Sequence, residues 1–369
     1  MIVGTMPPPY GGVNTLVKFY MEAEYESLRV ELFDCKEISM SRAHFFRRML
    51  ASGVTLARLL RRIWLSRPDV VLSFPSAGMS FVEKMVWGVP IRFLGAKYAA
   101  LMVDGHFPRR YAKMSGVARS CFRLLARMPD YLFAQSAVWK RYYEAFRAPA
   151  DVIELRMGID TERFRYEDRV EANFSSGTKD ILYVGWMLRE KGVHDLLDAF
   201  ALASAREPAL RLHLVGPDIG DGFERACADG HPSVTFWGKV PDEKLLELAR
   251  RALFVVLPSH AEGMPNILLE MMAMGVPVMA TPVGGIVDII TDGVDGVLVP
   301  AQEPRAWADA MVALSRDKDK LKRLAARAAD RIRERHGKDL VTDSLERAVL
   351  AVLGRGAGSG AQAVSSRGR

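Results

Sequence analysis

Two glutamates near an expected helix start are the strongest candidates for chemistry in this chain. Glu262 lies on a turn marked by Gly263 and Pro265, and Glu270 follows inside the apolar run ILLEMMAM. A carboxylate in apolar surroundings is costly unless hydrogen-bond donors satisfy it. The hydroxyl groups of a ribose or another sugar are such donors. The pair therefore favours a site for a polyhydroxylated ligand, although glutamates at this spacing are also common as surface or capping residues.

The elements around these acids predict an anion site. We expect a strand at 254–257, a loop at 258–264 and a helix at 267–274. Gly275 ends that helix, and Pro265 suits its first turn because the missing N–H is not needed there. Backbone N–H groups and the helix dipole at such a start favour a diphosphate. In open parallel sheets, ligands bind at this edge, beyond the carboxyl ends of the strands.

The rest of the chain alternates strand-like and helical patterns, which predicts parallel sheets covered by helices on both faces. The expected strands are 2–5, 70–74, 91–94, 131–135, 152–155, 181–185, 210–215, 234–237, 254–257, 276–280 and 297–299. Helices are expected between them, for example at 193–205 and 243–251. A chain of 369 residues is long enough for two cores. We therefore predict an α/β protein of two doubly wound, Rossmann-like domains that face a central cleft.

Changes in composition predict the domain boundaries. Residues 1–170 form the first domain and residues 171–337 the second, which opens with a linker at 171–179 (EANFSSGTK). A last helix at 338–353 is a candidate to pack back on the first domain. Residues 354–369, rich in Gly, Ser and Ala without an apolar period, are expected to be disordered.

Composition excludes several classes of protein. Hydrophobic residues make up 49% of the chain, as in globular proteins, and no apolar run reaches the roughly 18 residues of a membrane-spanning helix. The first ten residues have neither a basic region nor a long apolar run, so we expect no signal peptide. Cys35, Cys121 and Cys227 lack metal-ligand spacing and favour reduced, structural thiols. We therefore expect a cytoplasmic protein.

Charge is distributed unevenly along the chain. Residues 1–170 hold 26 Lys and Arg against 17 Asp and Glu, a surplus of +9, whereas the remainder holds 25 against 27, or −2. No acid lies between Glu37 and Asp69, or between Asp104 and Asp130. We expect no nucleic-acid partner, because no binding module, aromatic platform or zinc knuckle is visible.

The first acid-free segment allows two interpretations. Its arginines interleave with apolar side chains from Phe45 to Trp64. This pattern is typical of a basic amphipathic helix on an anionic membrane, and also of an ordinary helix with one buried and one solvated face. The membrane interpretation places the protein at the inner face of the plasma membrane, as a peripheral protein.

From about residue 181 to residue 300, the chain resembles the retaining glycosyltransferase family 4, the group 1 glycosyl transferases of GT-B fold. The resemblance rests on the segments YVGWMLREKGVHDLLDAF, LHLVGPD, VTFWGKV, LPSHAEGMPNILLEMMAMGVPVMATPVGGIVDII and DGVDGVLVP, in the family's order and spacing. Glu262 and Glu270 match the two acids of the family's E-x7-E motif. The resemblance implies retaining transfer of a sugar from a nucleotide-sugar donor, a UDP-sugar by family frequency, to a glycan or lipid-linked acceptor.

Roles for single residues follow from the resemblance. It implies that Glu262 contacts the donor sugar and that Glu270 holds the ribose. The backbone N–H groups of Gly263, Met264 and Asn266 would lie along the sugar and the diphosphate. No tightly bound metal is expected, because the family generally needs none. The departing diphosphate itself would take the acceptor proton, which explains why no nucleophile–base pair is evident.

The cations of the expected site depart from the family pattern at one position. Lys191 matches the lysine that neutralises the diphosphate. The family usually has Arg directly after the glycine of this motif, where this chain has Trp186, and the nearby Arg189 is a candidate substitute. Without a second cation the leaving group would be less stabilised. Gly238 and Lys239 match the segment that holds the base.

The resemblance is thinner in the first half. Gly11 and Gly12 match a glycine-rich turn after the first strand, where the backbone approaches a phosphate closely. In MVDGHFPRRY, Asp104 and Gly105 align with a His-Gly pair that many relatives place beside the donor sugar, and His106 follows. Either Asp104 or His106 could face the sugar. An ordinary tight turn and a structural histidine are the alternatives.

Synthesis of a cell-surface polysaccharide or glycolipid is the expected context, and two other functions remain open. One is a nucleotide-sugar epimerase of similar fold, which would turn over the donor without an acceptor. The other is a catalytically diverged binding subunit, which Trp186 and Asp104 suggest. A dinucleotide-dependent dehydrogenase is disfavoured, because no GxGxxG follows the first strand of either half.

Overall fold

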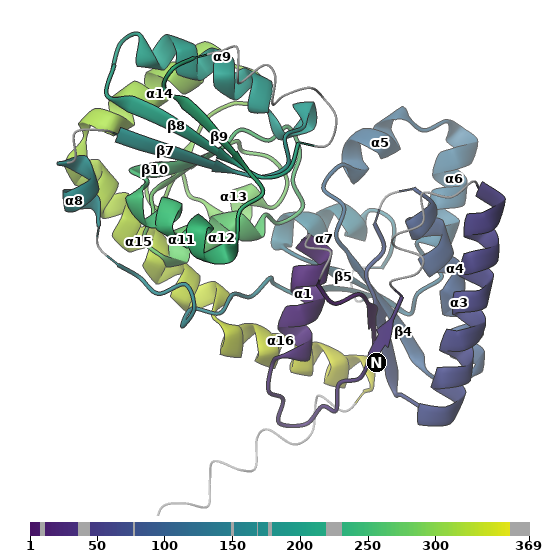
Figure 1. Cartoon of the computed structure of the whole chain (residues 1–369). Helices are drawn as coiled ribbons and strands as arrows, with labels where there is room; N and C mark the ends of the chain where they lie inside the picture. Colours follow the sequence, from purple (N-terminus) through teal and green to yellow (C-terminus); the bar gives the residue numbers. More distant parts are fainter. Residues whose placement is uncertain are drawn as a thin grey trace, which may run out of the picture. The chain divides into compact units, whose positions relative to one another are not determined.

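A computed structural model describes residues 1–7, 12–35, 45–76, 78–148, 151–167, 169–175, 179–218 and 231–354, with backbone only at 45–48. Contacts divide the chain into two units (Figure 1). Unit 1 is Met1–Gly158 together with the chain from Lys338 on, and unit 2 is Ile159–Gly337. Gly11, Cys227 and the tail from residue 355 lie outside the described residues.

The boundary between the units falls after Gly158, earlier than the position after residue 170 that composition predicts. The residues between these positions bond to unit 2. Ile159 N–H donates to the His336 carbonyl at 2.8 Å, and Glu167 N–H donates to the Met274 carbonyl at 3.2 Å. Within the described ranges, no helix combines the length and hydropathy that crossing a bilayer requires.

Unit 1 is built on a six-stranded parallel sheet in the order β2-β1-β3-β4-β5-β6. Its strands are β1 (Ile2–Gly4), β2 (Leu32–Asp34), β3 (Val70–Ser73), β4 (Lys97–Met102), β5 (Tyr131–Ala134) and β6 (Val152–Glu154). Its helices are α1 (Gly12–Met21), α3 (Phe45–Ser66), α4 (Met79–Phe93), α5 (Phe107–Lys113), α6 (Gly116–Leu125), α7 (Ala137–Glu144) and α16 (Lys338–Val352). Cys35 is buried and Cys121 is exposed, and both are free thiols.

One predicted strand of unit 1 is wrong. Residues 91–94 form the end of α4 and its cap, and the strand lies at β4 instead. A short apolar run does not distinguish a strand from a buried helical turn. Here Ile91 is fully buried against the core that also holds Tyr98 of β4. The short strand β2 has no counterpart among the predicted strands.

Unit 2 has a second six-stranded parallel sheet, in the order β12-β11-β10-β7-β8-β9. Its strands are β7 (Lys179–Val184), β8 (Leu210–Val215), β9 (Val234–Gly238), β10 (Phe254–Leu257), β11 (Val278–Ala280) and β12 (Val297–Leu298). Its helices are α8 (Val170–Phe174), a 3-10 turn (Arg189–Lys191), α9 (Val193–Ser204), α11 (Asp242–Arg251), α12 (Asn266–Ala273), α13 (Ile286–Ile289), α14 (Pro304–Arg316) and α15 (Lys318–His336). The predicted linker at 171–179 is wrong, because α8 and the start of β7 occupy most of it.

The two sheets confirm the prediction of two doubly wound α/β domains. The sheet of unit 2 has a switch point between β7 and β10. The strands β8 and β9 follow β7 on one side of this point, and β11 and β12 follow β10 on the other side. This switch point is where ligands bind in folds of this kind, outside the carboxyl ends of the strands.

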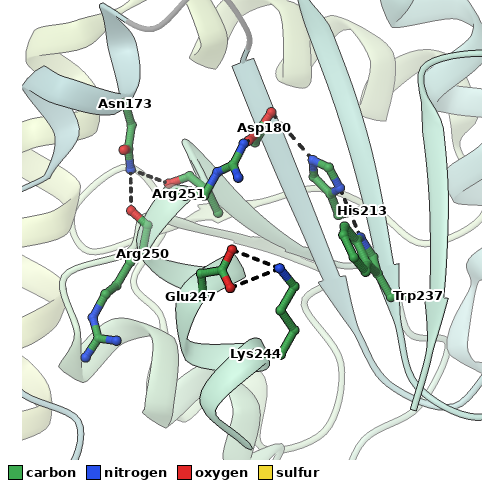
Figure 2. Close-up of polar contacts among 9 residues, drawn as sticks. Asn173, Asp180, His213, Trp237, Lys244, Glu247, Arg250 and Arg251 are labelled. Atoms are coloured by element: carbon green, nitrogen blue, oxygen red, sulfur yellow. Dashed lines mark hydrogen bonds and ion pairs between the residues drawn. The ribbon is translucent and has the colours of Figure 1, made fainter. Parts of the chain in front are cut away.

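A polar network joins α11 to α8 and to β7, and joins β7 through β8 to β9 (Figure 2). Asp180 of β7 lies 3.6 Å from Arg251 Nη2 and 3.5 Å from His213 Nε2 of β8. Trp237 Nε1 of β9 donates to His213 Nδ1 at 3.2 Å. Asn173 Nδ2 donates to the Arg250 carbonyl at 2.9 Å and so satisfies one of the last acceptors of α11. The bond from Trp237 holds the end of β9, which is part of the segment VTFWGKV that was matched to the family.

Candidate active site

Two loops of unit 2 meet at the switch point of its sheet. The strands β7 and β10 are parallel neighbours, with Leu182 opposite Val255. The loop after β7 leads into the 3-10 turn that ends at Lys191. The loop after β10 runs over 258–265 and leads into α12. The fold therefore brings residues far apart in the sequence to one edge of the sheet.

An ion pair joins the two loops. Lys191 Nζ lies 2.7 Å from Glu262 Oε1, with side-chain exposures of 26% and 10%. The same glutamate oxygen accepts a hydrogen bond from Ser259 Oγ at 2.7 Å, and Ser259 is fully buried. Thr281 Oγ1 in turn donates to the Ser259 carbonyl at 2.5 Å. Hydrogen bonds from a cation and a hydroxyl hold this carboxylate in place.

Backbone contacts fix the distance between the loops. His260 N–H donates to the Glu190 carbonyl at 3.0 Å. Gly192 directly follows the 3-10 turn with φ of 69°, and a Cβ there would lie 2.1 Å from the Pro258 carbonyl oxygen. Both the positive φ and the close approach require glycine at this position. The Lys191–Glu262 distance therefore depends on backbone packing as well as on the charges.

The helix α12 begins at Asn266, one residue after Pro265, which therefore lies just outside the first turn that was predicted for it. Gly275 follows the helix with φ of 75°, as expected for a glycine that ends a helix. Gly263 and the buried Met264 lie between Glu262 and the helix start. The residues predicted to line a sugar diphosphate thus share one short loop, and Gly285 N–H supports it by donating to the Gly263 carbonyl at 2.8 Å.

Glu270 lies in α12 between fully buried leucine and methionine side chains and is itself partly buried. Burial raises the pKa of its carboxyl group from 4.5 to about 7, an effect that the charge of Arg163 opposes and that of Asp242 reinforces. Arg163 forms an ion pair with Asp242. Among the described residues, no donor forms a hydrogen bond with the Glu270 carboxylate. A ligand with hydroxyl groups would supply such donors.

The other predicted residues of unit 2 do not take part in the ion pair. Arg189 is exposed on the 3-10 turn, and Trp186 is exposed at the end of β7. Gly238 ends β9 with φ of 63°, and its carbonyl accepts from Gly216 N–H at 2.9 Å. Lys239 follows it and is exposed. Because β8 separates β9 from β7, Gly238 and Lys239 lie two strands away from the strand that leads to Lys191.

The predicted residues of unit 1 lie after β1 and after β4. Gly12 is the first residue of α1. Asp104 accepts a hydrogen bond from His106 N–H at 3.0 Å and forms an ion pair with Arg110. His106 occupies the position just before α5. The Asp104 carboxylate therefore stabilises its own loop and helix, which is a structural role that the sequence did not reveal.

Sequence reasoning missed Ser259, Arg163 and Gly192. Ser259 lies three residues before Glu262 on the same loop, a spacing that could have indicated a local hydrogen bond. Arg163 carries no local signal, because only tertiary packing brings it near Glu270. Within the described part of the chain, no cluster of three or more His, Cys, Asp or Glu is arranged to hold a metal ion.

The chain is similar in sequence to known glycosyltransferases. The family model described as "Glycosyl transferases group 1" matches residues 178–317. A D-inositol 3-phosphate glycosyltransferase of Saccharomonospora viridis is 31% identical over 305 residues, which cover 76% of this chain and 69% of the relative. The enzyme of that name from Nocardia farcinica is 30% identical over 273 residues, 69% of this chain. The chain spans 59% of the length of this second relative.

Solved structures resemble the chain over almost its whole length. HepE of Anabaena, in complex with UDP and glucose, has a TM-score of 0.71 at 17% identity and covers 95% of this chain, with 91% of its own chain covered. Sucrose-phosphate synthase of Thermosynechococcus elongatus has a TM-score of 0.74 at 18% identity, with coverage of 96% and 99%. These likenesses show that the fold is GT-B. By sequence and by fold, the chain belongs to the group 1 glycosyl transferases.

Proposed function

We propose that this protein transfers a sugar from a nucleotide-sugar donor to an acceptor, with retention of the anomeric configuration. The observation that carries this proposal is the Lys191–Glu262 pair at the switch point, directly before the start of α12. A cation and a helix N-terminus suit a diphosphate, and a fixed carboxylate suits sugar hydroxyls. All three face the same edge of the sheet.

In this proposal each group of the site binds one part of the donor. Lys191 and the backbone N–H groups of Gly263, Met264 and Asn266 bind the diphosphate, and Arg189 adds a second cation. Glu262 accepts hydrogen bonds from the sugar, and Glu270 accepts them from the ribose. A UDP-sugar is the first donor to test, because the HepE structure contains UDP.

The proposed reaction needs no nucleophile from the protein. The bond between C1 of the sugar and the diphosphate oxygen breaks, and its electron pair stays on the diphosphate. The developing charge is stabilised by Lys191 and the start of α12. The acceptor hydroxyl forms the new bond to C1 on the same face, and its proton passes to the departing diphosphate. No metal requirement is proposed.

The acceptor is proposed from the relatives and from the resemblance. Relatives named D-inositol 3-phosphate glycosyltransferases make a phosphorylated cyclitol the first acceptor to test. Glycans and lipid-linked sugars are the second group, which fits synthesis of a cell-surface polysaccharide or glycolipid.

Donor turnover with and without acceptor tests the proposal. The full chain is incubated with UDP-sugars and GDP-sugars, with EDTA or magnesium, and the anomeric configuration of the product is determined by NMR. We expect acceptor-dependent release of nucleoside diphosphate and a retained anomer. Donor conversion that needs no acceptor would instead indicate an epimerase, and an inverted product would overturn the retaining assignment.

A binding subunit without activity is the second candidate, and Trp186 in the usual arginine position is the observation in its favour. A thermal-shift panel with UDP, GDP, ADP and NAD separates the two. Nucleoside diphosphate binding without turnover on any acceptor would support the binding subunit. Binding with turnover would exclude it. A ligand at about 100 times its Kd should stabilise the protein by roughly 2.7 kcal/mol.

A further inference from the structure

Three helices cover one face of the unit 1 sheet side by side. The helices α3, α4 and α6 lie in connections that step across the sheet in one direction, from β2 to β3, β3 to β4 and β4 to β5. Right-handed crossovers place such helices on one face and place α1, whose connection runs the other way, on the opposite face. The helix α4 contacts both α3 and α6 (Figure 1).

The outer side of these helices is unusually apolar. In α3 the core side is formed by buried residues such as Leu59 and Ile63, yet the outer side carries the exposed Leu50, Trp64 and Leu65. Phe93 at the end of α4 is 88% exposed, and Val117 and Leu124 of α6 are 77% and 64% exposed. Several large apolar side chains exposed on neighbouring helices are a candidate interaction site.

The helices that form this surface are rich in arginine. The 22 residues of α3 include five arginines and no acid, and α6 includes Arg119 and Arg123 and no acid. Both arginines of α6 contact α5: Arg123 Nε donates to the Tyr111 hydroxyl at 3.1 Å, and the Arg119 guanidinium lies 5.8 Å from the centre of the Tyr111 ring. Acids on or beside these helices offset part of this charge. Glu83 lies in α4, Asp130 pairs with Arg92 of α4 at 3.9 Å, and Glu31 pairs with Arg62 of α3 at 3.3 Å.

We infer that the outer surface of α3, α4 and α6, called here the α3–α4–α6 face, docks on an anionic membrane surface. Exposed apolar side chains would enter the boundary between headgroups and acyl chains, and the arginines would bind lipid phosphates. Charge complementarity selects the membrane over a second copy of the chain, because a twofold contact would bring two cationic surfaces together. This inference does not depend on the proposed glycosyl transfer.

Vesicle co-sedimentation of the full chain tests the inference. The probes are vesicles of phosphatidylcholine alone and vesicles that also contain phosphatidylglycerol. We expect binding to the anionic vesicles only, weakened by added salt because salt screens exposed charges. One variant combines Phe93→Ser, Val117→Ser and Leu124→Ser, and a second combines Arg61→Glu and Arg119→Glu. Each basic residue near the surface contributes about 1 kcal/mol, so the second variant should bind at least tenfold more weakly.

A matched control lies on α16, which packs beside α1. It combines Leu340→Ser with Arg347→Glu and so changes one exposed leucine and one exposed arginine. It should bind anionic vesicles as the wild type does. The apolar variant and the control change exposed residues and should keep the wild-type melting temperature. Arg61→Glu alone is measured beside the double basic variant, because Arg119 also donates to the Ala112 carbonyl at 2.7 Å. Absence of wild-type binding to anionic vesicles would overturn the inference. Unchanged binding of both α3–α4–α6 variants would also overturn it. A third result would overturn it as well: a wild-type dimer in light scattering that becomes a monomer in both α3–α4–α6 variants.

Discussion

Lys191 Nζ lies 2.7 Å from Glu262 Oε1, so a lysine that follows β7 and a glutamate that follows β10 form one ion pair. Each group neutralises the other in the free protein. In the proposed reaction, Lys191 must turn from Glu262 toward the diphosphate as the donor binds, and the sugar hydroxyls must replace it at Glu262. The pair is therefore the feature that most directly links this structure to its proposed chemistry.

Removing the lysine tests its role with the leaving group. Lys191→Ala should lower kcat about 10²- to 10³-fold, because a preorganised cation at a departing phosphate stabilises charge that develops only in the transition state. The control is Lys244→Ala, which removes a lysine of α11 that pairs with Glu247. Steady-state kinetics with a saturating donor measure both. Equal activity of the two variants would exclude Lys191 from catalysis.

Ser259 should act as a positioning residue through Glu262. Ser259→Ala removes the donor that lies 2.7 Å from Glu262 Oε1, and we expect kcat/KM for the donor to fall about tenfold. Ser315→Ala is a matched control, because Ser315 is also fully buried and its hydroxyl donates to the Val312 carbonyl of α14. Both variants should lose a similar amount of stability. A loss of kcat/KM as large in the control would mean that only stability had changed.

Gly192 should be intolerant of a side chain. Gly192→Ala combines a φ of 69° with a Cβ placed 2.1 Å from the Pro258 carbonyl oxygen, so the loops that carry Lys191 and Glu262 must move apart. We expect a loss of roughly 2 kcal/mol or more in the free energy of unfolding, with a loss of activity. Gly293→Ala has φ of 71° in open space and should cost only about 1 kcal/mol. Denaturant unfolding of both variants measures the difference, and equal costs would show that the contact with Pro258 does not matter.

Glu270 should make the stability of the free protein depend on pH. Its pKa is raised from 4.5 to about 7 by burial. The folded protein therefore binds a proton that the unfolded chain releases, so this stabilisation is fully present below pH 4.5 and is lost as pH rises through 7. The difference amounts to at most about 3 kcal/mol. Glu270→Gln should remove this component, and unfolding of both proteins across this pH range measures it. An unchanged pH profile in the variant would contradict the assignment.

Donor binding should depend on the same proton, but the affinity for the donor should rise over the pH range in which the stability falls. If the ribose hydroxyls donate to the ionised Glu270 carboxylate, the affinity for a UDP-sugar should rise as pH increases through 7, with release of a proton on binding. A UDP-sugar is the suitable probe, because its diphosphate is esterified at both ends and has no group that titrates near pH 7. Isothermal titration calorimetry in buffers of different ionisation enthalpy measures that proton. Glu270→Gln should bind more weakly and without the pH dependence. A wild-type affinity that stays constant over this range would separate Glu270 from the ribose.

Much of the fold and the central acids of the site could be predicted from the sequence. The alternation of apolar runs with helical periods is a local property, and it identified ten of the strands and both sheets. The loop with Glu262 and the helix with Glu270 are likewise encoded within one short segment. The strand at β4 was misplaced because IRFL fits a buried helical turn as well as a strand.

Only the tertiary structure decided which distant residues meet. The contact between Lys191 and Glu262 exists because β7 and β10 are neighbours in the sheet. The local periodicity of the sequence does not determine the order of the strands. The hydrogen bond from Ser259 and the charge of Arg163 near Glu270 depend on the same packing. The basic helix α3 gives a second example. Apolar residues occur on more than one of its sides, so its sequence does not determine which side is buried, and the sheet of unit 1 makes that choice by covering Leu59 and Ile63 and leaving Leu50 and Leu65 exposed.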